Sequence, residues 1–277
     1  MKASIIISFY NKIEFLKLVL LGFERQSFKD FEVIISDDGS SEDIVSELNI
    51  IIENSTLEIV HNWHEDNGWR KNIILNKSIK ISKSEYIIFV DGDCIPHKDF
   101  VKDHLASAEK NLILAGRRVM LGQSYCKSLN EKDVKLGKLD NFPLLVLKNF
   151  GDGTHLEKAF RLPKKMRNTF FNSYIEKYQP GVLSGCNFSM HKEDLILING
   201  FDERYLSACV GEDTDLEVRF LKGEGRIKRI KHAAIVYHIW HQLLSRAEIK
   251  VNLEILKQNM TNEIAFTPYG LEKTNEK

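Results

Sequence analysis

The sequence predicts an α/β protein with a doubly wound, mostly parallel sheet. Short apolar segments alternate with amphipathic ones through the first hundred residues. One apolar segment, residues 86–90, is too short to span a membrane and ends abruptly in Asp91-Gly92-Asp93. Strands separated by helices of this length pair in parallel through right-handed crossovers. The 277 residues, 43% of them hydrophobic, suffice for one large domain or two closely joined halves.

Four strands and three helices are expected in the first part of the chain. The strand segments are rich in β-branched and aromatic residues, whereas the helix segments place apolar residues at helical spacing. The expected strands are Ala3–Phe9, Phe31–Ser36, Leu57–His61 and Tyr86–Val90. The expected helices between them are Lys12–Gln26, Ser41–Glu53 and Arg70–Ile81. We predict a further helix over Asp99–Asn111 and one continuous strand over Leu112–Met120.

The pattern loosens from Gly122 to Pro180, where lysine-rich and aromatic segments alternate without a clear period. In a compact domain, such a stretch indicates either poorly legible helices or a functional insertion such as a mobile flap. Order returns over Gly181–His191. The later expected elements are a helix over Lys192–Asn199, a turn at Gly200-Phe201-Asp202, a helix over Glu212–Lys222, a strand over Ala233–Tyr237, an amphipathic helix near Leu243–Lys257 and a frayed polar tail, Leu271–Lys277.

Composition and charge argue against several classes of protein. Lysine plus arginine and aspartate plus glutamate number 39 each, so no overall field attracts nucleic acid or an acidic membrane. Two basic clusters, Arg161–Arg167 and Arg226–Lys231, are interpreted as solvated faces. The four cysteines are scattered without a Cys-x-x-Cys motif, which is typical of reduced thiols. With no secretory signal and no apolar segment long enough to span a bilayer, we expect a cytoplasmic protein that does not bind nucleic acid.

The acid pair Asp91 and Asp93 predicts a metal site. This pair directly follows a buried strand, and α/β sheets bind ligands at the carboxyl edge of their strands. Two carboxylates this close repel each other, so a divalent cation is their natural partner. Hard oxygen ligands favour Mg²⁺ or Mn²⁺ over zinc. The alternative is an ordinary Asp-Gly turn with a second acid.

Three further polar clusters fall at the ends of expected elements. Ser8-Phe9-Tyr10-Asn11 follows the first strand. Asp37-Asp38-Gly39-Ser40 follows the second, where a carboxylate accepts from a base or a ribose, although a turn that caps the next helix explains it equally well. Gly211–Asp215 opens a helix with three acids in four positions, which exceeds what helix capping requires and indicates a general base.

His238 and His241 stand apart from the other histidines because they follow an apolar strand. At a strand end, His238 is placed to complete a metal shell begun by Asp93, and a purely structural histidine is the alternative. A His-x-x-His pair without a thiolate partner is weak evidence for zinc.

Taken in order, these clusters resemble the family 2 inverting glycosyltransferases of the Rossmann-like GT-A fold. The resemblance covers residues 1–240, and five motifs carry it, each loose alone but specific in this order. They are Ser4–Lys12, Val33–Ser40, Asn67–Arg70 with Asn76, Asp91-Gly92-Asp93 at the DxD position, and the block from Leu183–Met190 through Asn199–Glu203 to Gly211–Asp213. The last block is similar to the acceptor half of galactosyltransferase and chondroitin-polymerase-like members.

The resemblance implies a role for each matching residue. Asp213 would be the general base, and Glu212 would hold sugar hydroxyls. Asp93 and His238 would bind Mn²⁺ or Mg²⁺, with His241 as the alternative ligand. The nucleotide sugar would be contacted by Ser8, Tyr10, Asp38, Arg70, Asp91, Gly92 and Asn187.

The same resemblance implies a division of the chain and a class of substrates. Residues 1–120 would bind a UDP-sugar (UDP-Gal, UDP-GalNAc, UDP-GlcNAc or UDP-Glc), and residues 121–240, with an insertion at 122–180, would bind the acceptor. The acceptor would be a cell-surface glycan or a lipid-linked oligosaccharide, which places the enzyme at the inner face of the cytoplasmic membrane. Residues 241–277 form a C-terminal helix and tail, and the amphipathic helix contacts either a membrane, a second subunit or, by our interpretation, the core.

Two departures and three alternatives qualify this interpretation. Many relatives carry a tryptophan where this chain has Ala208-Cys209-Val210, and residues 122–180 have no matching counterpart.

A haloacid-dehalogenase-type phosphohydrolase would also use Asp91 and Asp93 with Mg²⁺, but Cys94 is atypical in that class, whose motif follows the first strand of the fold. A non-catalytic nucleotide-sugar binder would not need the Glu212–Asp213 pair. A nucleotidyltransferase would need a glycine-rich phosphate loop after the first strand, which this chain lacks.

Overall fold

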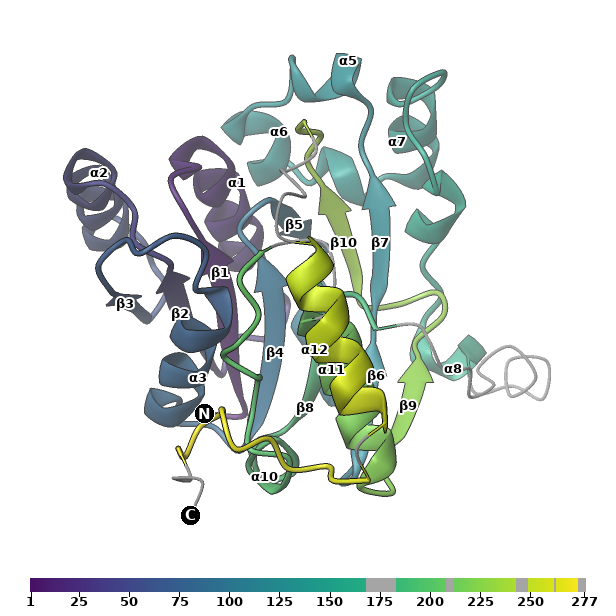
Figure 1. Ribbon diagram of the computed structural model, residues 1–277. Helices are drawn as coiled ribbons and strands as arrows, with labels where there is room; N and C mark the ends of the chain where they lie inside the picture. The colour runs from purple at the N-terminus through teal and green to yellow at the C-terminus, as the bar shows by residue number, and fades with distance from the viewer. Residues whose placement is uncertain (168–182, 208–211, 243–248, 262, 274–277) are drawn as a thin grey trace.

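The computed structural model describes residues 1–167, 183–207, 212–242, 249–261 and 263–273 as two sheets covered by helices (Figure 1). The larger sheet has seven strands in the order β3-β2-β1-β4-β8-β6-β9, and the smaller has three in the order β5-β10-β7. The seven strands are β1 (Ala3–Phe9), β2 (Phe31–Asp37), β3 (Ile59–Trp63), β4 (Tyr86–Asp91), β6 (Leu112–Ala115), β8 (Asn187–His191) and β9 (Arg226–Arg229). The three strands are β5 (Cys94–Pro96), β7 (Arg117–Met120) and β10 (Ile235–His238). The expected α/β fold with a mostly parallel, doubly wound sheet is therefore confirmed.

Parallel pairing brings the polar ends of the first strands to one edge. β1 pairs in parallel with β2 and β4, and β2 pairs in parallel with β3. In this register Ser8 lies between Ser36 and Asp91. β8 is antiparallel to both β4 and β6, and β9 is parallel to β6.

Apolar side chains alternate between the two faces of the large sheet, so two hydrophobic cores form. Ile5 and Ile7 of β1 belong to one core, and Ile6 belongs to the other. The first core includes α1 (Ile13–Glu24) and α2 (Glu42–Glu53), whereas the second includes α3 (Lys71–Ile81), α10 (Lys192–Leu197) and α11 (Glu212–Lys222). Helices on both faces are the layers that a doubly wound sheet requires.

The prediction of one continuous strand over Leu112–Met120 was wrong. The chain turns at Gly116, so that β6 joins the large sheet and β7 the small one. The Gly116 amide donates a 3.0 Å hydrogen bond to the Asn187 carbonyl, and a Cβ at residue 116 would collide with the Asn187 side chain. β6 is buried along its whole length, whereas in β7 only Val119 is buried.

Two further predictions need correction. The helix expected over Asp99–Asn111 is shorter, with α4 covering Phe100–Leu105. The basic segment Arg226–Lys231 was interpreted as a solvated face, but its residues Arg226–Arg229 form strand β9. Ile227 of this strand is buried between basic residues that are at least partly exposed. Strand β5 was also not predicted. The short elements between 122 and 167 are α5 (Gln123–Cys126), α6 (Glu131–Lys135), η1 (Lys138–Asp140), α7 (Phe142–Lys148), η2 (Leu156–Ala159) and α8 (Lys164–Arg167).

The C-terminal helix α12 (Ile249–Thr261) packs against α11 (Figure 1). Its inner face presents Asn252, Ile255 and Asn259, which are all buried. Core packing is therefore the observed role of this face, as we interpreted it, although residues 243–248 of the expected helix lie outside the described residues. Over the ranges that the structure describes, every helix is too short or too polar to cross a lipid bilayer.

Candidate active site

The adjacent ends of β1 and β4 carry the first part of the site. The Ser8 hydroxyl donates a 2.5 Å hydrogen bond to Oδ1 of Asp91. The Lys71 ammonium, at the first position of α3, donates to the same oxygen at 2.9 Å. The Gly92 amide donates to the Ser8 carbonyl at 2.8 Å, and a Cβ on Gly92 would come within 3.0 Å of that oxygen. The charge of Asp91 is thus already balanced by Lys71.

A second polar group surrounds Asp38 at the end of β2. Its Oδ2 accepts from the backbone N–H of Arg70 at 2.9 Å, and its Oδ1 lies 2.8 Å from Nε2 of His64. Burial raises the pKa of Asp38, although the hydrogen bonds from Arg70 and His64 act in the opposite direction. The Arg70 guanidinium turns back on its own chain and donates to the Trp69 carbonyl at 2.8 Å. Asp38 is therefore bonded to the backbone of Arg70, and the guanidinium of Arg70 is bonded to the Trp69 carbonyl instead.

Tyr10 reaches this group from the turn after β1. Its hydroxyl donates to Oδ2 of Asp66 at 3.0 Å, and this bond raises the pKa of Tyr10. Gly39 has a φ of 94°, and a Cβ there would collide with the Asp66 backbone. Glycine at position 39 therefore allows the Asp66 loop to lie directly on the turn that holds Asp38.

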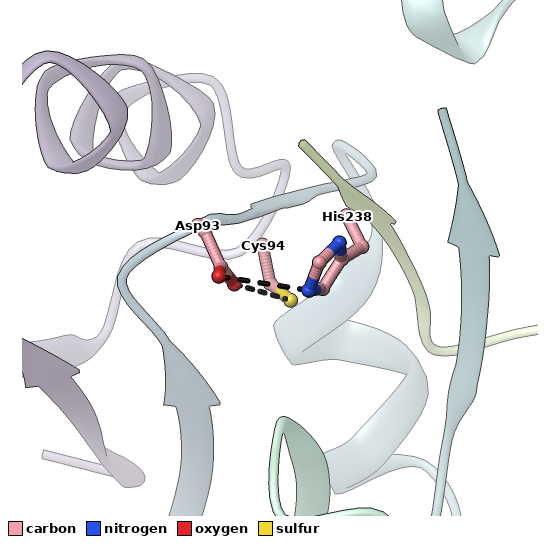
Figure 2. Close-up of side chains that lie close together, drawn as sticks. All are labelled: Asp93, Cys94 and His238. Carbon is pink, nitrogen blue, oxygen red and sulfur yellow. Dashed lines mark hydrogen bonds and ion pairs between the residues drawn. The ribbon is translucent and has the colours of Figure 1, made fainter. Parts of the chain in front are cut away.

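Asp93 meets two histidines from the far end of the chain. β10 pairs with β5 so that His238 lies opposite Cys94. Oδ2 of Asp93 is 3.5 Å from Nε2 of His238 and 3.0 Å from Nε2 of His241. Figure 2 shows Asp93, Cys94 and His238 converging, and their ligand atoms all lie within 4.8 Å of one another.

The chemistry of these donors fits a divalent cation. Burial opposes ionisation of Asp93, but the hydrogen bond from His241 and the attraction of the two histidines in their protonated forms outweigh it, so the pKa of Asp93 lies below its ordinary value. Burial lowers the pKa of His238, which keeps its imidazole neutral and able to coordinate. Burial raises the pKa of the Cys94 thiol well above its ordinary value, so the sulfur stays protonated and is a poor ligand. A carboxylate with one or two imidazoles suits Mn²⁺ better than Ca²⁺ or Mg²⁺, which prefer oxygen ligands throughout.

Asp213, in the first turn of α11, faces the same cavity as the Asp91 group. The Gly185 amide donates to Oδ2 of Asp213 at 2.9 Å. Ser8, Lys71, Gly185 and Asp213 line this cavity, whose floor is apolar. The cavity, of about 10 Å³, therefore joins Ser8 and Lys71 to the start of α11, whereas Asp91, Asp93 and His238 are not among the residues that line it.

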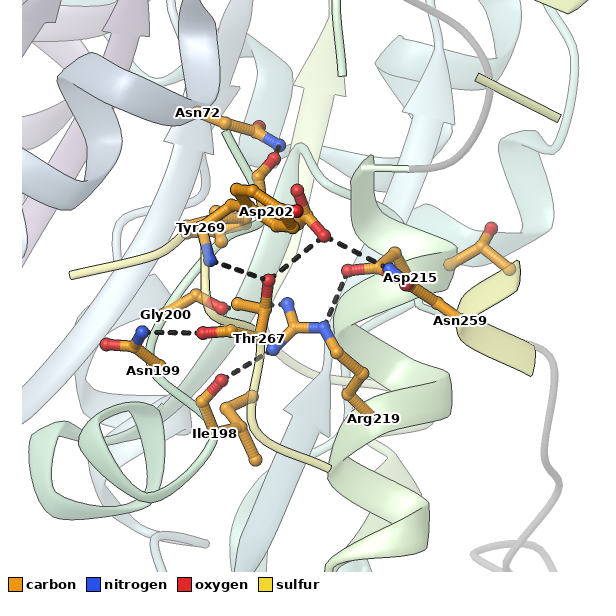
Figure 3. A network of polar contacts seen from close by, with 12 residues as sticks. Asn72, Ile198, Asn199, Gly200, Asp202, Asp215, Arg219, Asn259, Thr267 and Tyr269 are labelled. Carbon is orange, nitrogen blue, oxygen red and sulfur yellow. Dashed lines mark hydrogen bonds and ion pairs between the residues drawn. The ribbon is translucent and has the colours of Figure 1, made fainter. Parts of the chain in front are cut away.

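A buried polar network fixes α11 against its neighbours (Figure 3). Arg219 pairs with Asp215 at 2.7 Å and donates to the carbonyls of Ile198 and Gly200 at 2.7 and 2.8 Å. The Asn259 amide of α12 joins the two acids, donating to Asp215 at 2.6 Å and to Asp202 at 3.1 Å. The helix that presents Asp213 is thus held by the C-terminal part of the chain.

One predicted site residue has other partners than expected, and another lies outside what the structure describes. Asn187 is buried, and its amide donates to the carbonyls of Arg117 and Ala234 at 3.0 and 2.8 Å while its Oδ1 lies 3.1 Å from His104. These structural partners occupy the side chain, so we do not retain Asn187 among the donor contacts. Glu212 begins α11, but its side chain lies outside the described residues, as does Ala208-Cys209-Val210.

Two residues of the site were missed from the sequence. Lys71 was hidden because Arg70, beside it, is the more usual phosphate-binding side chain and drew the assignment. His64 lies in a segment without a clear period, and its partner Asp38 becomes visible only when β2 and β3 pair. The spacing of basic residues around the start of α3 was the only available signal for Lys71.

Comparison with known proteins identifies the family of the chain. A family model described as "Glycosyl transferase family 2" matches residues 4–196, and one described as "N-terminal domain of galactosyltransferase" matches residues 166–242. Chondroitin synthase from Escherichia coli is 26% identical over 254 residues, covering 85% of this chain and 34% of the synthase. The chain therefore spans about a third of that relative. The uncharacterized glycosyltransferase YfnE from Bacillus subtilis is 25% identical over 303 residues, covering 99% of this chain and 76% of YfnE.

A solved structure shows the same fold. The crystal structure of S. aureus TarS 1-349 in complex with UDP-GlcNAc matches with a TM-score of 0.58 at 18% identity, covering 95% of this chain and 67% of that chain. Nothing among these matches supports the phosphohydrolase alternative. Since a single family model covers well over half of its residues, the chain belongs to glycosyl transferase family 2 and is a glycosyltransferase.

Proposed function

We propose that the protein transfers a sugar from a UDP-sugar to a hydroxyl group of a glycan or lipid-linked oligosaccharide, with inversion at the anomeric carbon. The observation that carries this proposal is the cavity lined by Asp213, Ser8 and Lys71, of which Ser8 and Lys71 both donate to Asp91. A donor site at the strand ends and a base on α11 are what a one-step displacement needs on opposite sides of a sugar. The UDP-GlcNAc complex of TarS supports a UDP-linked donor.

The donor would lie along the carboxyl edge of the large sheet. Asp38, Tyr10 and the start of α3 offer polar groups for the uracil and ribose. Ser8, Gly92 and Asp91 lie deeper, where Lys71 supplies a positive charge for the diphosphate. In this arrangement Asp38 and Asp91 orient the nucleoside, and Lys71 balances the charge of the phosphates.

Asp93 and His238 would hold a divalent cation, Mn²⁺ or Mg²⁺, with His241 as a further ligand. When bound, such an ion stabilises the negative charge that develops on the leaving diphosphate. Asp93 has the lowered pKa and His238 the neutral imidazole that such coordination requires.

Asp213 would act as the general base. The Gly185 amide fixes its Oδ2, which leaves the carboxylate oriented toward the cavity. As the acceptor oxygen attacks the anomeric carbon, Asp213 takes the hydroxyl proton, which contributes about 10²–10⁴ in rate. Glu212 remains a candidate for holding sugar hydroxyls. An α-linked donor would give a β-linked product.

The organisation of the chain follows from these roles. We propose residues 1–120 as the donor half, residues 121–240 as the acceptor half with an insertion at 122–180, and residues 241–277 as a C-terminal support. A lipid-linked acceptor would bring the enzyme to the inner face of the cytoplasmic membrane.

Thermal-shift screening tests the donor. We expect UDP-sugars with Mn²⁺ to raise the melting temperature more than GDP- or TDP-sugars do, since a ligand that binds the folded state stabilises it by mass action. For any UDP-sugar that binds, the rate at which the protein releases UDP without an acceptor then measures the slow hydrolysis of that donor. Failure of every UDP-sugar to shift the transition, with and without Mn²⁺, would remove the proposal.

A further inference from the structure

Four basic side chains gather beside the active site and form what we term the basic cluster: Arg117, Arg118, Lys158 and Arg229. Arg117 and Arg118 are the first residues of β7, Lys158 lies in η2, which packs beside β7, and Arg229 ends β9. Burial lowers the pKa of Lys158, and the charges of the three arginines lower it further. The side chains are therefore close enough for their like charges to repel one another.

Within the part of the chain that the structure describes, no carboxylate forms an ion pair with any member of the basic cluster. Nε of Arg117 is buried and has no hydrogen-bond partner among the described atoms. The carboxylate that acts on Arg117 is Glu157, whose side chain is 71% exposed and lies 3.9 Å from His155. Glu157 also acts on Lys158, and Asp91 acts on Arg118, but neither carboxylate forms an ion pair with the cluster among the described residues. Four positive charges placed together without such pairs repel one another, so the cluster is not explained by stability.

The basic cluster extends into the acceptor side of the site through Arg118. Nη1 of Arg118 lies 3.7 Å from Sγ of Cys186, the residue after the glycine that holds Asp213. β7 runs parallel to β10, and the register sets Met120 opposite His238, so Arg118 lies two residues along β7 from the position beside the proposed metal ligand. The uracil-side group around Asp38 belongs to β2 and β3 at the other end of the large sheet.

We propose that the basic cluster binds an oxyanion of the acceptor, a carboxylate or a phosphate, so that the acceptor is an acidic glycan. Arginine offers planar, paired donors that match the two oxygens of such a group, and the unpartnered Nε of Arg117 is one of them. The anion would lie on the Cys186 side of the cavity, where Arg118 reaches it. This inference rests on the proposed transferase function, because it takes the Asp213 side of the cavity as the acceptor side.

The first experiment uses inorganic phosphate as the probe, with the protein saturated by UDP and Mn²⁺ so that the donor site is closed to it. We expect phosphate to raise the melting temperature more than chloride at equal ionic strength. In the Arg117→Gln/Lys158→Gln variant the rise should be less than half. The matched control is Lys132→Gln/Lys135→Gln, on the surface helix α6, which should behave like the unaltered protein. No specific rise with the unaltered protein, or an equal rise in the Arg117/Lys158 variant, overturns the proposal.

Folding of the variant is checked in the same experiment. Because removing two repelling charges relieves strain between like charges, we expect Arg117→Gln/Lys158→Gln to melt no lower than the unaltered protein in low salt without phosphate. Single variants at each position provide a second series if the pair fails to fold. A cluster that merely supports structure would instead lose stability in each of them.

The second experiment compares three oligosaccharide probes of equal length: one containing glucuronate, a polyol phosphate oligomer, and a neutral one. We expect one of the acidic probes to bind the UDP- and Mn²⁺-loaded protein at least about tenfold more tightly than the neutral probe, as charge-assisted hydrogen bonds allow. The Arg117→Gln/Lys158→Gln variant should lose this preference while its affinity for UDP stays the same. Equal binding of the neutral probe, or a loss confined to UDP affinity, refutes the proposal, and the latter outcome would assign the cluster to the donor diphosphate. Absence of any UDP-sugar binding would defeat the transferase proposal instead, and the phosphate comparison would still report on the cluster.

Discussion

The backbone amide of Gly185 donates a 2.9 Å hydrogen bond to Oδ2 of Asp213, which joins the loop before β8 to the first turn of α11. Glu217, one turn further along α11, accepts from the Leu183 amide at 3.1 Å. Two acids on one helix face thus hold the loop at residues 183–185 and the cavity wall together. This contact sets the position of the proposed base together with the Thr214 amide, which donates to Oδ1 of Asp213 at 2.7 Å.

Replacing Asp213 by asparagine tests its role as the base. We expect transfer to fall by about 10²–10⁴, because the amide cannot accept the proton, while the Gly185 hydrogen bond to its oxygen is kept. Steady-state transfer and calorimetric UDP titration measure the two effects. Asp152→Asn, at an exposed loop, is the control. A parallel loss of UDP affinity would argue against a base.

Metal dependence is tested by chelation and by single replacements. We expect EDTA to stop transfer, and added Mn²⁺ to restore it. Asp93→Asn should raise the Mn²⁺ concentration needed for half-maximal activity by more than tenfold, and His238→Ala should do the same, since loss of an inner ligand or of its support commonly costs 10–100-fold in affinity. His241→Ala separates the two histidines, because a smaller change there would leave His238 as the ligand. Full activity in EDTA would contradict the metal site.

Lys71 should act on the donor. We expect Lys71→Met to raise the KM for the UDP-sugar about tenfold, because the charge beside Asp91 and the diphosphate is lost. Lys80→Met, on the same helix and half-exposed, should leave the KM unchanged. Unaltered donor KM in Lys71→Met would show that this lysine only neutralises Asp91.

The ion pair between Arg219 and Asp215 should be costly to break. Both side chains are almost fully buried, so Arg219→Met leaves the Asp215 charge without its partner. We expect the free energy of unfolding to fall by about 3–5 kcal/mol, measured by urea denaturation. Arg226→Met, at an exposed pair with Glu109, should change it by less than about 1 kcal/mol. Equal effects of the two replacements would mean that the network in Figure 3 does not anchor α11.

His104 should make stability depend on pH. Burial lowers the pKa of His104 to about 4 from 6.5, so the folded state takes up its proton later than the unfolded state does. The stability that this group contributes is fully present above pH 6.5 and is lost as the pH falls toward 4. The loss at pH 5 is about 2 kcal/mol. His104→Gln should therefore lose less stability than the unaltered protein between pH 7 and pH 5 in urea titrations. A pH dependence identical in both proteins would show that His104 is not buried as a neutral ring.

Local pattern was sufficient for the first part of the fold. The apolar runs of β1 and β2 and the helical spacing of α1 and α2 are set by side chains that each segment carries itself. Their predicted bounds therefore agree with the structure to within a few residues. The strand before Asp91 was equally clear, because a buried parallel strand is apolar along its whole length.

The break at Gly116 and the strand β9 were not legible in the same way. Gly116 interrupts an apolar run only because the backbone must approach Asn187 there, and that partner lies on a distant strand. In β9 a single buried residue, Ile227, stands among basic residues, so the segment reads as a solvated face. Pairing with β6 supplies the missing information.

The sequence alone predicted the α/β class, the order of the donor-side strands and the acids at their ends. These features depend on the hydrophobic pattern within each segment, which the sequence contains. Tertiary structure alone decided that Lys71 neutralises Asp91, that His238 and His241 converge on Asp93, that Asn187 is structural and that Asp213 faces the cavity of Ser8. These contacts join residues separated by twenty to more than two hundred positions, and their geometry depends on how sheets and helices pack, which no local pattern contains.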